Sequence, residues 1–346
     1  MNFKIYLTMN YTQQLSILIL LSLMILSACS SSDDDEDLMG NWVEMGSFEG
    51  VPRCDAVAFV IDNYAYVGTG YDGVEDERLN DFWRYDAEKD FWTQIAPFEG
   101  AARNGAVGFG ANGKGYVTTG YDGKNRLNDT WEYNASANSW TQKSDFGGSA
   151  RYDAVSFALN NKGYVGTGYD GNLLKDFWQY DPVTDSWEQR VSIGGKKRRD
   201  ATAFVIDDKA YVLTGSDNGQ YLDDMWEYDA ANDIWNAKRD IDKDANEDES
   251  YDDEYEIVGI KSVSFSINGL GYITTGGPGA PGALTWEYNP DSDVWEQRSN
   301  HEGSPRYDAV SFVINNEPYI ATGRSSGYYF DDVWTFKPNE EQDDDD

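Results

Sequence analysis

Residues 151–190 read RYDAVSFALNNKGYVGTGYDGNLLKDFWQYDPVTDSWEQR, and this stretch contains the pattern that decides the fold. It starts at Arg151, continues through Tyr164 to the Thr-Gly pair that ends at Gly168, and closes with Trp178 and Trp187, nine residues apart. Between these landmarks, short runs rich in β-branched and aromatic residues alternate with Gly, Asn and Asp. Such runs predict four short strands joined by tight turns, without a helical period.

The same pattern recurs about every 48 residues, as from Trp83 to Trp131. Five Trp pairs keep the spacing of nine: Trp83/Trp92, Trp131/Trp140, Trp178/Trp187, Trp226/Trp235 and Trp286/Trp295. An Arg stands eleven residues after a Trp in five units: Arg53, Arg103, Arg151, Arg198 and Arg306. The Tyr-x-x-Thr-Gly sequence occurs six times, ending at Gly70, Gly120, Gly168, Gly215, Gly276 and Gly323. A four-stranded repeat near 50 residues indicates a blade of a β-propeller, so we predict an all-β, six-bladed propeller over residues 41–337.

The fifth unit departs from the regular spacing of the repeat. The first and last units are each incomplete, and each has what the other lacks. Gly259 takes the Arg position there, 24 residues after Trp235 instead of eleven, which indicates a 13-residue insertion. The last unit stops before its second Trp, whereas Trp42 has no partner nine residues before it. We therefore expect the strand around Trp42 to complete the last blade and to close the ring without an open edge.

The repeat resembles the kelch motif, in which an early Arg, a hydrophobic strand ending in Gly-Gly, a Tyr and a Trp stand at fixed offsets. The resemblance covers residues 41–337, and Thr replaces the first Gly of the pair in every unit. It implies a propeller that binds a protein or glycan ligand. Kelch propellers also include enzymes, namely copper oxidases of the galactose oxidase type and six-bladed sialic acid mutarotases.

Composition excludes several functions. The chain has 27 Lys and Arg against 62 Asp and Glu, a net charge of −35, which disfavours nucleic acid as a partner. His301 is the single His, and Cys29 and Cys54 are the two Cys, so a copper or zinc site with several His ligands cannot form. We expect no metal and no cofactor. Catalysis, if present, would rely on carboxylates, Arg, Lys or Tyr.

The first 28 residues have the features of an export signal. An apolar run from Leu15 to Leu26 is too short to span a bilayer, and it is followed by Ser27, Ala28 and Cys29. This ending resembles the lipobox of bacterial lipoprotein precursors, which implies that Cys29 is lipidated and becomes the mature N-terminus. Residues 29–40 are predicted to be an acidic tether, and residues 338–346 an acidic disordered tail. We expect an outer-membrane lipoprotein, facing the cell surface or otherwise the periplasm.

One face of the propeller gathers the candidate ligand-binding residues. Because strands alternate in direction, the starts of the innermost strands and the loops between the second and third strands emerge together. Cations gathered there would attract a carboxylate-bearing ligand. The candidates are Arg306, Tyr307, Asp308, Arg324 and Lys261, with Arg151, Tyr152 and Tyr169 across the mouth. A structural role is the alternative for the repeated Arg and Asp, since a group present in nearly every blade usually serves the blades themselves.

Unit five breaks the symmetry of this face. It carries Lys261 in place of Asp, Leu284 in place of the Asp before Trp, and Gly277-Pro278-Gly279-Ala280-Pro281-Gly282 in place of Tyr-Asp-Gly. The insertion, residues 240–256, places acidic side chains at alternate positions as a calcium loop does. Ala245 and Tyr251 occupy the positions where such a loop needs Gly and Glu, so we interpret the insertion as a solvated acidic loop.

Three classes of function are open from the sequence, and one of them, a scaffold component of an outer-membrane complex, differs from the binding class below only in its partner. The first is non-catalytic binding of a protein or glycan by a lipid-anchored propeller. The second is a sugar mutarotase or epimerase that uses Arg and carboxylates at the channel mouth.

Overall fold

The computed structural model describes residues 39–241, 255, 257, 259–277 and 279–343. These residues form strands and turns and contain no helix, as the sequence predicts. Among them there is accordingly no helical segment that could cross a membrane. The predicted signal peptide, most of the tether and most of the acidic insertion fall outside the described residues, so those assignments stay predictions.

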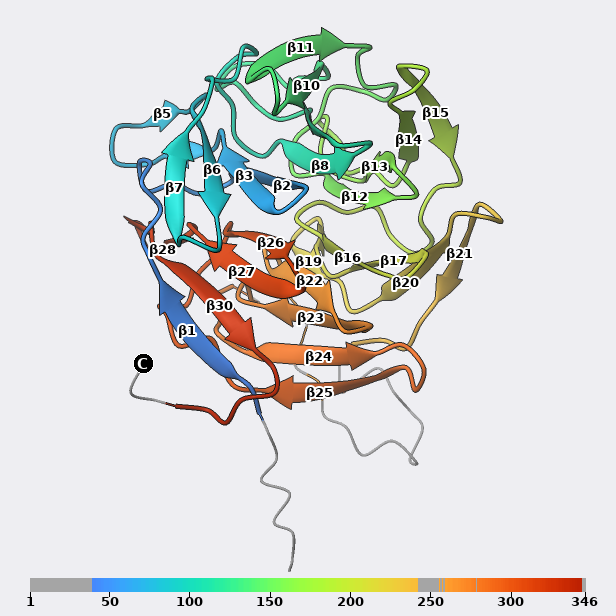
Figure 1. The fold of residues 1–346 in the computed structure, drawn as a ribbon. Coiled ribbons are helices and arrows are strands. Elements are labelled where there is room, and N and C mark those ends of the chain that lie inside the picture. Colours follow the sequence, from blue (N-terminus) through green and yellow to red (C-terminus); the bar gives the residue numbers. More distant parts are fainter. Residues whose placement is uncertain (1–38, 242–254, 256, 258, 278, 344–346) are drawn as a thin grey trace, which may run out of the picture. The chain divides into compact units, whose positions relative to one another are not determined.

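Six four-stranded antiparallel sheets form the blades, and Figure 1 shows them arranged around a common centre. From the centre outward, blades one to three comprise β2 (Val57–Ile61), β3 (Tyr64–Gly68), β6 (Phe82–Asp86) and β7 (Phe91–Gln94); β8 (Val107–Ala111), β9 (Lys114–Thr118), β10 (Thr130–Asn134) and β11 (Ser139–Lys143); and β12 (Val155–Leu159), β13 (Lys162–Gly166), β14 (Phe177–Asp181) and β15 (Ser186–Arg190). Blades four to six comprise β16 (Thr202–Ile206), β17 (Lys209–Leu213), β20 (Met225–Asp229) and β21 (Ile234–Ala237); β22 (Val263–Ile267), β23 (Leu270–Thr274), β24 (Thr285–Asn289) and β25 (Val294–Arg298); and β26 (Val310–Ile314), β27 (Glu317–Ala321), β30 (Val333–Lys337) and β1 (Asn41–Met45). Three short hairpins lie in loops: β4 (Tyr71–Asp72) with β5 (Glu77–Arg78), β18 (Ser216–Asp217) with β19 (Gln220–Tyr221), and β28 (Arg324–Ser325) with β29 (Tyr328–Tyr329).

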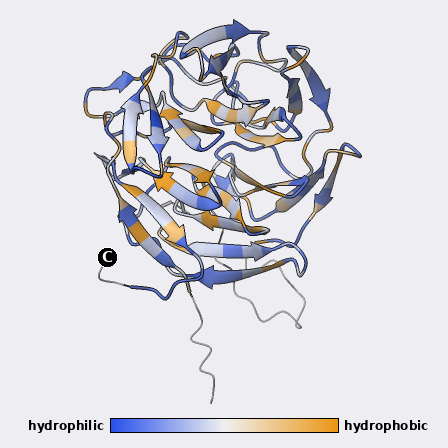
Figure 2. Ribbon diagram, viewed as in Figure 1, coloured by the Kyte–Doolittle hydropathy of each residue, from blue (hydrophilic) through white to orange (hydrophobic). Residues whose placement is uncertain are grey.

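The core lies between neighbouring blades. The innermost strands contact one another in a closed cycle, and along β2 every second residue is buried. In Figure 2 the strands nearest the centre are coloured more hydrophobic than outer strands such as β11 and β15. Phe59 stacks on Tyr66 within blade one, and both rings contact Tyr133 of blade two. Gly115 of blade two must lack a side chain, because a Cβ there would collide with the ring of Phe59. Aromatic side chains thus fill the wedge-shaped space that opens between radiating sheets.

The first strand closes the ring as predicted. β1 pairs with β30 in the last blade, with Trp42 opposite Phe336. The Trp42 side chain is fully buried, and its indole N–H donates to the backbone oxygen of Ser299 at 3.2 Å. Sequence segments from both ends of the fold therefore share one sheet, and β30 has no open edge.

Part of the predicted acidic tail, residues 338–343, lies within the described residues, and the disorder assigned to the tail stays a prediction. The backbone N–H of Gly40 donates to the oxygen of Glu340, and the N–H of Asp343 donates to the side-chain oxygen of Asn41. These two hydrogen bonds connect the described part of the tail to β1 and the residue before it.

His301 is buried beside this closure. His301 occupies the position equivalent to Phe48, Phe98 and Phe146 in other blades. In all four cases the backbone N–H donates to a backbone oxygen in the loop before the third strand of the blade. The His301 ring packs edge-on against Trp42 and Trp334, and neither ring nitrogen has a partner among the described residues. Burial, with the charge of Arg306 adding to it, lowers the pKa of His301 from 6.5 to about 3. His301 is therefore neutral in the folded protein.

Deleting residues 41–48 should destabilise the propeller strongly, because it removes the buried Trp42 and exposes the edge of β30. Loss of one large buried side chain alone lowers the free energy of unfolding by about 3–5 kcal/mol. Urea denaturation measures this change. Tyr328→Ala is the control, since that side chain is 75% exposed. Equal stability of the deletion variant and the control would contradict closure through β1.

Acidification should destabilise the wild-type protein more than a His301→Phe variant. Below pH 6.5 the unfolded chain binds a proton at His301 that the folded protein excludes until about pH 3, so stability is lost as the pH falls through this window. Between pH 7 and pH 5 the wild type should lose about 2 kcal/mol more than the variant. Urea denaturation at both pH values tests this difference. Parallel losses in the two proteins would show that His301 is not held neutral by the fold.

Candidate functional site at the channel mouth

The inner strand starts and the loops between the second and third strands do lie on one face. Within a blade they are joined by isolated backbone bridges, such as Cys54 with Tyr71, Tyr152 with Tyr169, and Tyr307 with Arg324. Each segment that leads into an inner strand is therefore fixed to a loop of its own blade. The predicted location of the candidate residues on one face is consistent with this arrangement.

The repeated Arg side chains are structural. All five are fully buried: Arg53, Arg103, Arg151, Arg198 and Arg306. Each forms an ion pair of 2.6 or 2.7 Å with the Asp that stands two residues before the first Trp of its unit, and that Trp donates its indole N–H to the same Asp. The sequence-based assignment of Arg151 and Arg306 to ligand contact therefore needs correction, because neither side chain has surface to offer a ligand.

Four of the Asp partners, Asp81, Asp129, Asp176 and Asp332, are held ionised by these pairs. Burial alone would raise the pKa of Asp332, but the hydrogen bonds and charge of Arg306 outweigh burial and lower that pKa. The same balance applies to Asp81 with Arg53. Such a buried, bidentate pair fixes the start of the inner strand to the start of the third strand.

Six residues close a backbone ring around the channel mouth. They are Asp55, Gly105, Asp153, Asp200, Lys261 and Asp308, one from each blade, and each N–H donates to the oxygen of its counterpart in the neighbouring blade over 2.9 to 3.3 Å. All six have a positive φ, between 51° and 61°. This ring directs four carboxylates and one ammonium group into a hollow of about 130 Å³.

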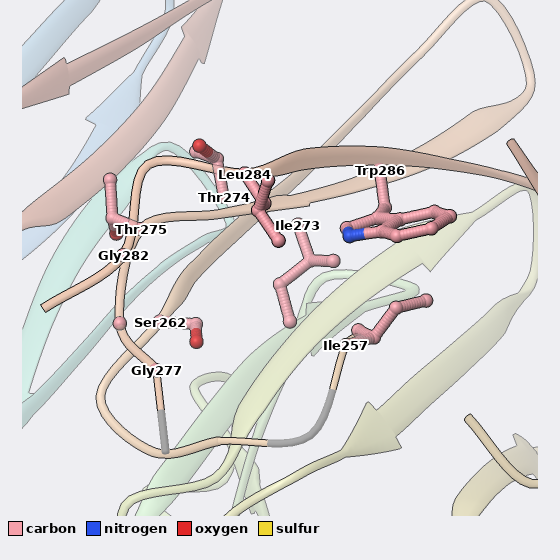
Figure 3. Close-up of a pocket in the computed structure, with 10 residues that line it drawn as sticks. Ile257, Ser262, Ile273, Thr274, Thr275, Gly277, Gly282, Leu284 and Trp286 are labelled. Atoms are coloured by element: carbon pink, nitrogen blue, oxygen red, sulfur yellow. The ribbon is translucent and has the colours of Figure 1, made fainter. Parts of the chain in front are cut away.

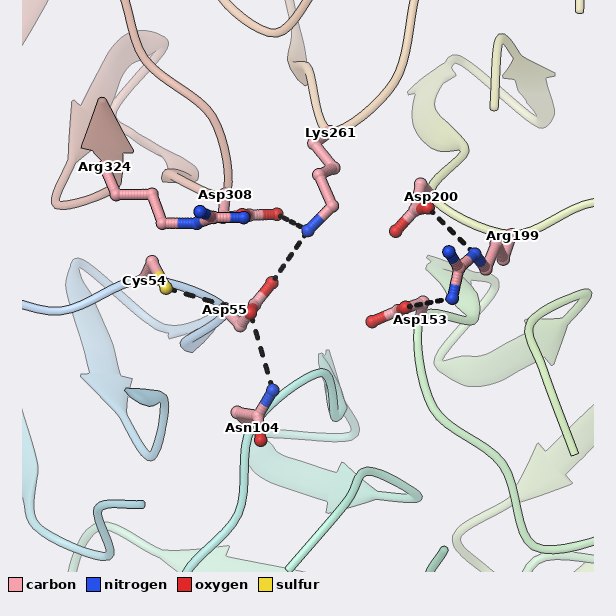
Figure 4. A network of polar contacts seen from close by, with 9 residues as sticks. All are labelled: Cys54, Asp55, Asn104, Asp153, Arg199, Asp200, Lys261, Asp308 and Arg324. Atoms are coloured by element: carbon pink, nitrogen blue, oxygen red, sulfur yellow. Dashed lines mark hydrogen bonds and ion pairs between the residues drawn. The ribbon is translucent and has the colours of Figure 1, made fainter. Parts of the chain in front are cut away.

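Ion pairs connect the carboxylates of this hollow to three cations, Lys261, Arg199 and Arg324, as Figure 4 shows. Lys261 lies 2.6 Å from Asp308 and 3.6 Å from Asp55, and Arg324 lies 2.9 Å from Asp308. On the other side, Arg199 lies 3.3 Å from Asp200 and 3.7 Å from Asp153. The cations at the mouth are thus already paired, which weakens the expected attraction for a carboxylate-bearing ligand.

The ring carboxylates differ in their affinity for protons. Burial and the charge of Asp55 raise the pKa of Asp308 to about 7, although Lys261 opposes the shift. Burial and the charge of Asp200 raise the pKa of Asp153 well above its usual range. Burial would also raise the pKa of Asp55, but Lys261 and a hydrogen bond from Asp308 lower it instead. Near neutral pH, Asp308 is therefore partly protonated while the neighbouring Asp55 is ionised.

The mouth is a poor metal site. Cys54, Asp55 and Asp308 bring possible ligand atoms within 4.8 Å of one another. However, the Lys261 ammonium contacts both carboxylates, and burial raises the pKa of the Cys54 thiol, which stays protonated. Metal ligands must be deprotonated, so this donor set does not suit a metal ion.

A larger groove adjoins the mouth between blades three, four and five. It has a volume of about 410 Å³ and is lined by Tyr152, Tyr169, Leu173, Arg199, Asp200, Ser216, Asn218, Gly219, Tyr221, Ile260 and Lys261. Tyr221 is 38% exposed, and among the described residues no guanidinium group covers its ring. Tyr169, by contrast, lies under Arg126 and Arg199, with guanidinium carbons 5.1 and 5.6 Å from its ring centre. Tyr221 is therefore the aromatic ring most available to a ligand.

The predicted site residues divide into three groups. Tyr152, Tyr169 and Lys261 line the groove, and Lys261 and Asp308 line the mouth with Arg324 bound to Asp308. Tyr307 is half-buried beside Arg324 and lines neither space.

Sequence reasoning missed two groove residues, Arg199 and Tyr221. A signal for Arg199 exists, because the residue between the repeated Arg and Asp positions varies among the units and is a cation in only one of them: Cys54, Asn104, Tyr152, Arg199, Ile260 and Tyr307. Tyr221 has no such signal, since it falls in a hairpin whose length differs between blades.

Comparison with known proteins agrees with this architecture. Residues 43–198 match the family model "KLHDC2/KLHL20/DRC7 Kelch-repeats domain", and residues 197–239 match the model "Kelch motif". A search of curated proteins gave no match. A solved structure titled "Structure of YjhT" superposes with a TM-score of 0.69 at 17% sequence identity, covering 84% of this chain and 95% of that one. The repeats, the six sheets and these matches together show that the chain belongs to the kelch-repeat β-propellers.

Proposed function

We propose that this protein is a lipid-anchored propeller of the cell envelope that binds a glycan in the groove beside the channel mouth. The observation that carries the proposal is the groove itself, a hollow of about 410 Å³ whose lining combines the exposed Tyr221 with the polar residues Arg199, Ser216 and Asn218. A sugar needs an aromatic face for its C–H groups and planar or hydroxyl partners for its hydroxyl groups.

The polar groups of the groove suit hydroxyl groups better than an isolated anion. Arg199 keeps donor capacity beyond its ion pairs with Asp153 and Asp200. Ser216, whose backbone bridges to Arg199, lines the groove together with Asn218. Because the cations are already paired with carboxylates, a neutral polyhydroxylated ligand binds without leaving a buried charge unmatched. A protein segment would have to present similar chemistry to the same groove.

Catalysis is the second candidate, favoured by the carboxyl groups of the mouth. Asp308 has a pKa of about 7 and lies within the same hollow as Asp55, Asp153 and Asp200. A carboxyl group that is partly protonated near neutral pH, beside an ionised one, can supply both general acid and general base, which is what mutarotation or epimerisation of a sugar requires.

Binding of a sugar should depend on Tyr221 and Arg199 and should tolerate changes elsewhere. Tyr221→Ala and Arg199→Ala should each weaken binding by about 1–3 kcal/mol while leaving the melting temperature nearly unchanged. Isothermal titration calorimetry with the hit from a glycan panel provides the measurement.

Two matched controls sharpen this test. Tyr328→Ala removes an exposed Tyr outside the groove and should not affect binding, whereas Arg198→Ala removes a buried ion pair and should mainly lower stability. Capture of a protein instead of a glycan, or unchanged affinity in both groove variants, would overturn the glycan proposal. Faster interconversion of the bound sugar's anomers, lost in Asp308→Asn, would favour the enzyme.

Lipidation of Cys29 is part of the same proposal and rests on the sequence before it. Cys29→Ala should release the protein from the membrane fraction, because stable attachment would depend on the acyl chains. Mass spectrometry of the purified protein measures the modification directly. A mature chain with an unmodified Cys29, or one that still contains Ala28, would contradict it.

A further inference from the structure

Blade five lacks the buried ion pair that the other blades share. Gly259 stands in the Arg position and Leu284 in the Asp position, so both charges are missing together. Trp286 follows Leu284 by two residues, as Trp334 follows Asp332 in blade six. Trp334 donates its indole N–H to Asp332 at 2.8 Å. The indole N–H of Trp286 has no partner among the described residues, although the side chain is only 8% exposed.

A hollow occupies the position that the guanidinium takes in other blades. It measures about 60 Å³ and is lined by Ile257, Ser262, Ile273, Thr274, Thr275, Gly276, Gly277, Gly282, Leu284 and Trp286. Thr275, Leu284 and Trp286 are the counterparts of Thr322, Asp332 and Trp334, which surround the Arg306 side chain or share its partner. We call this space the blade-five slot.

The blade-five slot borders both the surface and the candidate site. Ser262, Gly277, Gly282 and Leu284 each retain exposed surface. Ser262 also lines the channel-mouth hollow, and Ile260, which bridges to Gly277, lines the groove. Figure 3 shows the nitrogen edge of Trp286 directed toward the other lining side chains. The slot therefore presents a hydrogen-bond donor at the side of an apolar space that adjoins the groove.

We propose that the blade-five slot binds a short neutral acyl group, such as the acetamido substituent of a ligand. The apolar side chains of Ile257, Ile273 and Leu284 disfavour a charged group, because no ion pair remains there to compensate its desolvation. The unpaired indole N–H requires an acceptor, which a carbonyl oxygen supplies. The volume limits the group to a few heavy atoms, since one water already needs about 10–15 Å³. The inference deepens the proposed function, because the slot would hold the substituent of a sugar bound in the groove.

The direct test follows the indole N–H signals by ¹⁵N NMR while N-methylacetamide is added in excess. The Trp286 signal, identified by its loss in Trp286→Phe, should shift with saturation, whereas the signals of Trp indoles that donate to Asp should not. Leu284→Asp supplies an internal acceptor, as in the other blades, and should abolish the shift. Leu284→Met keeps the apolar lining and should preserve it. An unshifted Trp286 signal in the wild type would overturn the proposal.

A second measurement separates the slot from the groove and the possible sources of the acyl group. If the slot serves a groove-bound sugar, N-acetylglucosamine should bind at least tenfold more tightly than glucosamine, and Trp286→Phe should remove this preference. Tyr221→Ala should weaken both sugars equally. Failure of both sugars, with N-methylacetamide still shifting the Trp286 signal, would contradict the glycan proposal and leave the slot established. Tighter binding of an N-acetylated amino acid amide would assign the acyl group to a peptide.

Discussion

The fold depends on a guanidinium group that has no access to water. A fully buried charge is tolerated only with a matched counter-charge and satisfied hydrogen bonds, and each repeated Arg has both. In blade one, Arg53 binds Asp81 through two nitrogens and donates to the backbone oxygen of Thr69, while Trp83 donates to the same Asp. Loop residues far apart in the unit are thereby held at one point. A backbone hydrogen bond connects this point to the neighbouring blade, because the N–H of Gly70 donates to the oxygen of Arg103.

In five of the six blades this interaction accompanies an otherwise unfavourable backbone conformation. The Thr of every Thr-Gly pair has a positive φ, between 57° and 64°, and its hydroxyl is buried without a partner among the described residues. A left-handed conformation costs an L-residue roughly 1–2 kcal/mol. In five blades that conformation accompanies a Thr carbonyl that accepts a hydrogen bond from the buried Arg. Thr275 in blade five keeps the conformation although Gly259 offers no guanidinium, so the Arg is not required for it. The inter-blade bond that follows the Thr is kept as well, because the N–H of Gly276 donates to the oxygen of Arg306.

The spacing of Trp and Arg residues predicted the architecture well, because each repeat keeps equivalent residues at fixed distances along the chain. Trp and Arg offsets gave the blade count, the insertion and the closure through Trp42, all of which depend on which residues share a strand. Spacing carries no information about burial. It therefore could not distinguish the role of Arg198, which is buried, from that of Arg199, which lines the groove. The blade-five slot could not be predicted from the sequence either. The sequence shows the substitutions at Gly259 and Leu284, but only the structure shows the hollow and the Trp286 indole N–H that has no partner among the described residues.

The asymmetry of blade five follows from electrostatics at the mouth. The backbone ring places one side chain from each blade around a hollow of about 130 Å³, and four of these are carboxylates. A fifth Asp at position 261 would add another charge to a cluster in which Asp153 and Asp308 already hold protons more tightly than usual. Lys261 instead contacts Asp55 and Asp308 across the mouth and lowers the cost of burying both. The unit that departs most from the repeat is thus the unit whose ring position supplies a cation, and this cation pairs with the carboxylates of Asp55 and Asp308.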